Sequence, residues 1–64
     1  MKNQYQSAKM VLKEIAINAK RNHKNDKPQI RQIINDSAYY LGSDLSEYQK
    51  TLLSNYACKL HPNN

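Results

Sequence analysis

The sequence predicts an all-α fold, a compact three-helix bundle that forms one domain over residues 1–64. Apolar residues recur at steps of three and four along three segments, which is the helical period, and nowhere alternate as they do in a strand. Residues that start or stop helices bound these segments. The connections between the segments are short, so consecutive helices must pack against one another. A chain of 64 residues allows one small core and no second domain.

The first helix is predicted over residues 4–22. Asn3 and Gln6 have the spacing of a capping box, in which two side chains three residues apart each bond the other's backbone N–H. The apolar stripe ends before Asn22, and residues 22–25 are expected to form a polar turn. The stripe consists of Tyr5, Ala8, Val11, Leu12, Ile15, Ala16 and Ala19.

The second helix is predicted over residues 28–41. Asp26 is expected to cap its start, and Pro28 falls in the first turn, where a missing N–H costs nothing. Its apolar side consists of Ile30, Ile33, Ile34, Ser37, Ala38 and Leu41.

Two further expectations concern the end of this helix. Tyr40 follows Ile33 by seven residues and is expected to face inward, so Tyr39 should point elsewhere. Gly42 is expected to end the helix in the left-handed conformation that glycine adopts readily.

The third helix is predicted over residues 45–60. Asp44 and Glu47 have capping-box spacing at its start, and Pro62 stops it, so residues 61–64 are expected to form a frayed tail. Its broad apolar face consists of Leu45, Tyr48, Leu52, Leu53, Tyr56, Ala57 and Leu60.

The composition excludes several classes of protein. The single cysteine, Cys58, rules out an intramolecular disulfide framework and indicates a reducing, cytoplasmic location. No apolar run exceeds four residues, which is too short for a membrane-spanning helix or a signal peptide. A single glycine leaves no Gly-rich loop that could cradle phosphates.

The sequence contains no arrangement of residues that predicts an enzyme or a cofactor site. Serine, histidine and aspartate all occur, but no turn motif presents a nucleophile. Cys58 and His61 are three residues apart, with His23 as a distant third ligand, and this set is too sparse to predict a metal site. We therefore expect no catalytic residues, no metal and no cofactor.

The positive charge is concentrated in one part of the chain. The net charge is +6 over residues 1–31 and −1 over residues 32–64. Five basic residues should gather at one end of the bundle, where they could bind phosphates, an acidic protein or anionic lipid, or only keep the protein in solution. This basic end consists of Lys20, Arg21, Lys24, Lys27 and Arg31.

The second and third helices also allow a helix-turn-helix interpretation. Ala38 precedes Gly42 by four residues, the spacing of the small residue and turn glycine in that motif. The presumed reading helix nevertheless opens with Asp44 and Glu47, which would face phosphates. Its candidate DNA-reading residues are Ser46, Gln49 and Lys50.

Three apolar residues are candidate contacts to a partner protein or a second copy of the chain. Met10 and Ile17 lie one heptad apart on the first helix, away from its main stripe. Tyr39 offers a large, rigid and amphipathic contact, the kind that often anchors interfaces.

Two segments resemble small uncharacterised accessory proteins of phages and mobile elements in low-GC Gram-positive bacteria. They are residues 27–36, KPQIRQIIND, and residues 53–62, LSNYACKLHP. The resemblance implies an early protein that binds and redirects a host or defence protein in the host cytoplasm, and it transfers no site residues. The chain also resembles bacteriocin immunity proteins, which are basic helical bundles, but it is shorter and lacks a fourth helix.

The preferred hypothesis is a non-enzymatic protein-binding module that inhibits or redirects a host protein. The basic end would speed association with an acidic target, and Met10, Ile17 and Tyr39 would supply apolar contacts. The alternative is a small DNA-binding regulator that uses the basic end or the third helix.

Overall fold

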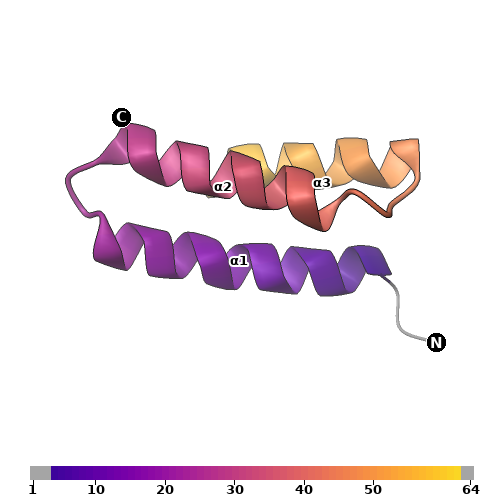
Figure 1. Ribbon diagram of the computed structural model, residues 1–64, viewed down its shortest axis with the longest axis horizontal. Helices are drawn as coiled ribbons and strands as arrows, with labels where there is room; N and C mark the ends of the chain where they lie inside the picture. Colours follow the sequence, from indigo (N-terminus) through magenta and orange to yellow (C-terminus); the bar gives the residue numbers. More distant parts are fainter. Residues whose placement is uncertain (1–3, 63–64) are drawn as a thin grey trace.

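The computed structural model describes residues 4–62, which fold into three helices: α1 (Gln4–Asn22), α2 (Lys27–Leu41) and α3 (Glu47–Leu60). The helices run up, down and up along the long axis of a molecule that measures 38 × 19 × 16 Å (Figure 1). The α1–α2 loop therefore lies at one end and the α2–α3 connection at the other. The described residues contain no strand, so the predicted all-α three-helix bundle is confirmed.

A single core lies between the three helices, and half of its buried residues are alanines. Alanine side chains are short, so the helices that carry them can approach one another closely. Partly buried side chains, among them Tyr5, Ile33 and Tyr56, extend this core toward the surface. The buried set is Ala8, Leu12, Ala16, Ala19, Ile30, Ile34, Ala38, Leu45, Leu53 and Ala57.

The bounds of α2 agree with the sequence prediction to within one residue, but the backbone conformation expected of Gly42 does not. The Asp26 carboxylate accepts a hydrogen bond from the backbone N–H of Gln29 at 3.2 Å, and Pro28 lies in the first turn. Gly42 has φ −88° and ψ 0°, so the expected left-handed conformation is wrong. The chain keeps its right-handed sense for one more residue because the Gly42 N–H still donates to the Ala38 carbonyl at 2.9 Å.

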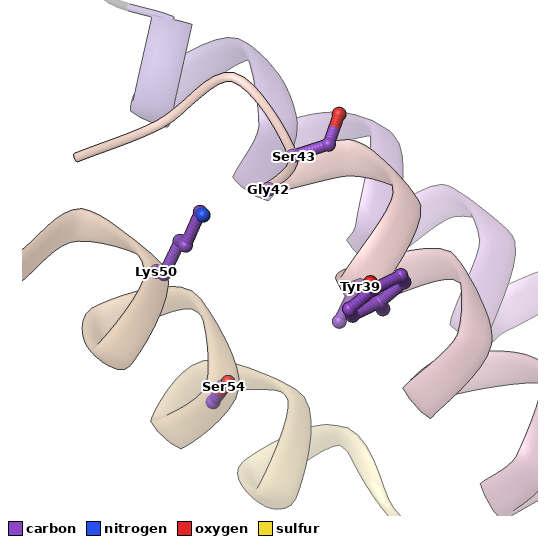
Figure 2. A pocket seen from close by; sticks show the side chains of 6 residues that line it. Tyr39, Gly42, Ser43, Lys50 and Ser54 are labelled. Carbon is purple, nitrogen blue, oxygen red and sulfur yellow. The ribbon is translucent and has the colours of Figure 1, made fainter. Parts of the chain in front are cut away.

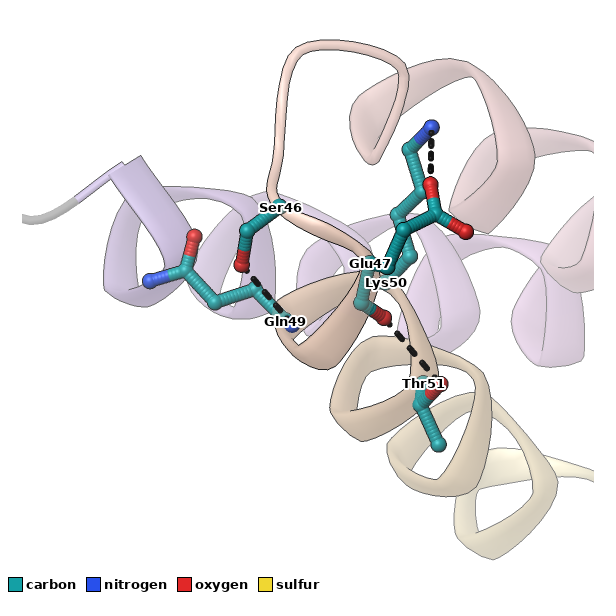
Figure 3. Close-up of polar contacts among 5 residues, drawn as sticks. All are labelled: Ser46, Glu47, Gln49, Lys50 and Thr51. Atoms are coloured by element: carbon teal, nitrogen blue, oxygen red, sulfur yellow. Dashed lines mark hydrogen bonds and ion pairs between the residues drawn. The ribbon is translucent and has the colours of Figure 1, made fainter.

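The start of α3 lies two residues later than predicted. Ser46, and not Asp44, is the N-cap, and its hydroxyl accepts a hydrogen bond from the Gln49 N–H at 3.2 Å (Figure 3). Leu45 lies before the helix, where its side chain is buried in the core and its N–H donates to the Gly42 carbonyl at 3.0 Å. The predicted capping box of Asp44 and Glu47 is therefore wrong.

The C-terminal end of α3 contacts α2. His61 Nε2 lies 2.7 Å from Asn35 Oδ1, and His61 and Pro62 are both half-buried. These two residues, expected to begin a frayed tail, lie against the bundle. The predicted cap at Asn3 and residues 63–64 lie outside the described part of the chain.

Candidate interaction surfaces

The basic end comprises residues from three consecutive parts of the chain. Lys20 and Arg21 occupy the last turn of α1, where cations are favourable beside the helix carbonyls. Lys24 lies in the loop, Lys27 begins α2 and Arg31 lies one turn later. The first four are exposed and Arg31 is half-buried. The fold thus gathers this sequence-predicted set around the α1–α2 loop, at one end of the molecule (Figure 1).

A further cationic contact was not predicted from the sequence. The Lys9 ammonium lies 5.5 Å from the ring centroid of Tyr5 and 5.0 Å from that of Tyr56. Both distances are within the range of cation–π attraction, so Lys9 links α1 to α3. The four-residue spacing of Tyr5 and Lys9 was the available signal for one contact, but the contact across to Tyr56 depends on how the helices pack.

The two apolar residues that lie away from the main stripe of α1 are exposed. Met10 is 70% exposed and Ile17 is 40% exposed. The buried residues of α1, such as Leu12 and Ala16, lie on the opposite side of the helix. The main stripe of α1 therefore does not bury Met10 or Ile17, and both are available for contact.

Both tyrosines near the end of α2 are exposed, Tyr39 at 85% and Tyr40 at 79%. The expectation that Tyr40 faces inward is wrong. The inward positions of α2 advance from Ile34 to Ala38 in a step of four, and half-buried Leu41 comes next. Tyr40 is consequently left at the edge of the helix, where its hydroxyl reaches water.

Tyr39 borders a hollow between α2 and α3 with a volume of about 310 Å³ (Figure 2). Gly42 contributes to its wall, and Lys50 and Ser54 approach from α3. A Cβ on Gly42 would lie 3.1 Å from the Ala38 carbonyl oxygen and 3.4 Å from Leu53 Cδ2. A larger residue at this position would therefore crowd the last turn of α2, whereas its distance to α3 would be that of an ordinary contact.

Of the three candidate DNA-reading residues, Ser46 is exposed, while Gln49 and Lys50 are partly covered. Ser46 is used as the cap of α3. Lys50 Nζ lies 3.3 Å from Glu47 Oε2, as Figure 3 shows, and its side chain borders the hollow toward α2. In addition, α2 and α3 both run along the long axis (Figure 1), whereas the helices of a helix-turn-helix cross steeply, at about 90–120°.

The described residues contain no cluster of side chains that could hold a metal ion. Cys58 is exposed, and His61 bonds to Asn35 instead of lying beside a second ligand. No helix within residues 4–62 has the length and apolar character needed to span a membrane.

Comparison of the chain with protein-family models, with characterised proteins and with solved structures finds no match.

Proposed function

We propose that the protein is a non-enzymatic binding module whose partner is another protein. One observation carries this proposal: large apolar side chains stand out into solvent on separate helices, with Met10 70% exposed on α1 and Tyr39 85% exposed on α2. Exposed aromatic and methionine side chains are enriched in protein interfaces. A chain of 64 residues has a small core and would gain stability by burying such side chains. Their exposure therefore supports a role in binding.

The proposed partner is a host or defence protein that this protein inhibits or redirects. The resemblance of residues 27–36 and 53–62 to phage accessory proteins supports that choice of partner. The basic end supports a target with an acidic or nucleic-acid-binding surface, because opposite charges accelerate diffusional encounter.

Affinity capture from a bacterial lysate tests the proposal. The immobilised protein is expected to retain a defined partner, and a variant with Met10→Gln, Ile17→Gln and Tyr39→Ser is expected to retain at least about tenfold less of it. These substitutions remove apolar contact area and leave the core intact.

A control variant with Gln6→Ala and Asn18→Ala changes exposed polar residues of α1 and should retain the partner fully. Equal capture by the triple variant and the unchanged protein would contradict the proposal.

DNA binding is the second candidate function, and the basic end is the observation that favours it. Five phosphate contacts would give a slope of about −4.5 for the logarithm of affinity against the logarithm of salt concentration. Titration of labelled duplex DNA at about 50 and 200 mM salt measures this slope. Binding that disappears when Lys20, Arg21, Lys24 and Lys27 become Gln would support DNA binding, and absent binding at low salt would eliminate it.

A further inference from the structure

A shallow groove between α1 and α2 is lined by core residues such as Ala8 and Leu45 and by more exposed side chains, and none of them belongs to the contacts proposed above. Two hollows of about 410 and 360 Å³ meet there, because Val11 and Leu41 line both. The α1 wall includes residues from Gln4 to Ile15, a length of about 16 Å at 1.5 Å per residue. No α3 residue lines either hollow.

The groove is apolar along its length. Val11 is 46% exposed and Tyr40 79% exposed, and half-buried Ile15 and Leu41 lie between them and the core. Leu45 closes one end from the α2–α3 connection. An occupant of this groove would therefore bury mostly hydrocarbon.

Carboxylates border the same groove. Asp36 lines one hollow and Asp44 the other, and neither carboxylate forms an ion pair or a hydrogen bond with another described residue. Glu14 follows Val11 by three residues, so it lies one turn further along that side of α1. Elsewhere in the described chain, the Asp26 carboxylate caps α2 and the Glu47 carboxylate pairs with Lys50.

The positive charges of α1 lie away from the groove. Lys9 extends over Tyr56 of α3, which places it on the other side of the helix, and Lys13 follows it by four residues. The basic end surrounds the α1–α2 loop, whereas Asp44 lies in the connection at the opposite end of a 38 Å molecule. Charges separated by more than about 8 Å in solution are largely screened at physiological ionic strength. The groove is thus locally acidic although the chain as a whole is basic.

We propose that this groove binds an amphipathic helix of the partner protein, with Lys or Arg flanking its apolar face. The inference rests on the proposed function and specifies the surface and the chemistry of the partner. A helix satisfies its own backbone hydrogen bonds, so it can lie on an apolar surface that offers no backbone groups to pair with. Placed against α1 and α2, it completes a four-helix arrangement, and its basic flanks meet Asp36 and Asp44.

The probe is a model helical peptide of about 15 residues, with Leu at i, i+3, i+4 and i+7 and Lys elsewhere. The control peptide has Leu at the same positions and Glu in place of Lys. Titration followed by amide chemical shifts is expected to show binding of the Lys peptide, with changes concentrated on the groove residues. The Glu peptide is expected to bind at least about tenfold more weakly.

Variants separate the apolar contribution from the electrostatic one. Tyr40→Ser should weaken binding of the Lys peptide by at least about tenfold, and Asp36→Asn with Asp44→Asn should remove the preference for Lys over Glu. Tyr48→Ser is the matched control, because Tyr48 is a similarly exposed tyrosine outside the groove.

Three results would overturn the inference: equal affinity for both peptides, chemical-shift changes away from the groove, or equal weakening by Tyr48→Ser and Tyr40→Ser. Sedimentation that reveals a dimer dissolved by Tyr40→Ser would assign the groove to a second copy and overturn it as well. The lysate capture uses Met10, Ile17 and Tyr39, none of which lines the groove. Failure of the peptide with successful capture therefore rejects the groove and leaves the proposed function standing.

Discussion

The side-chain oxygens of Asp26 and Ser46 each accept a hydrogen bond from the backbone N–H three residues later, at 3.2 Å in both cases. The first N–H groups of a helix have no partner within the helix, so each cap satisfies a group that would otherwise lack a partner in the protein. Because these bonds are local, their effect can be tested with single substitutions.

Ser46→Ala is expected to lower the free energy of unfolding by about 1 kcal/mol, because it removes the acceptor for the Gln49 N–H. Asp44→Ala at the position that the sequence favoured should change it by less than about 0.5 kcal/mol. Urea unfolding followed by far-UV circular dichroism measures both. A larger loss from Asp44→Ala than from Ser46→Ala would contradict the cap seen here.

Lys9 provides a second test at the same scale. Its ammonium lies 5.0 Å from the Tyr56 ring centroid, and a partly exposed cation–π contact contributes about 0.5–1 kcal/mol. A double-mutant cycle of Lys9→Gln and Tyr56→Leu should give a coupling energy of about 0.5 kcal/mol. The same cycle with Lys13→Gln in place of Lys9→Gln should give none.

At the scale of the elements, alanines at the helix contacts set how closely the helices approach. Ala8, Ala16 and Ala19 form the buried side of α1 together with Leu12. A larger side chain at these positions would have to push a neighbouring helix away, because a packed interior holds little free space.

Ala16→Leu is therefore expected to lower the free energy of unfolding by about 1–3 kcal/mol, since Ala16 is only 1% exposed. Asn18→Leu, which adds the same side chain at an exposed position of the same helix, should cost less than about 0.5 kcal/mol. Thermal unfolding of the two variants separates overpacking from a change in helix propensity. Similar melting temperatures for both would argue against close packing at Ala16.

The sequence predicted the elements well where a local signal determines the outcome. Asp26, Pro28 and the apolar period fix α2 to within one residue of its observed start. Asp44 and Ser46 both offer a capping oxygen, however, and burial of Leu45 in the core selects between them. Tertiary packing decided that boundary, so the local pattern could not.

Some features of the candidate surfaces could likewise be predicted from the local sequence, and others could not. Helical periodicity placed Met10 and Ile17 away from the main stripe of α1, and both are exposed, but it did not predict that Val11 of that stripe is 46% exposed. The contact between Lys9 and Tyr56 joins residues of different helices, and so does the groove that Asp36 borders. Their positions depend on how the helices are placed side by side, which periodicity within one helix does not give.

For the whole molecule, stability depends on very few large side chains. Among residues 4–62, the large side chains that are at most 2% exposed are Leu12, Ile30, Ile34 and Leu53. At roughly 0.05–0.15 kcal/mol per residue, a chain of 64 residues has a total stability of about 3–10 kcal/mol.

Leu53→Ala is expected to remove about 2–5 kcal/mol, a large part of that total, because it leaves a cavity in the core. Leu52→Ala at the adjacent half-buried position should cost clearly less. Urea unfolding measures both variants. Different midpoints with the same slope of unfolding free energy against urea concentration would confirm that the two substitutions differ in their effect on stability. Equal midpoints for the two variants would contradict the burial of Leu53.

The position of the basic end has a consequence for how the molecule moves. Its five cations surround the α1–α2 loop, so the centre of positive charge is displaced from the centre of mass of an elongated body. In the field of an acidic surface this displacement produces a torque that turns the loop toward the surface before contact. The opposite end, with Asp44 and Leu45, then faces back into solution. A molecule captured by its loop thus keeps that end of the α1–α2 groove accessible to a helix of the same partner, so the two contacts can form one after the other.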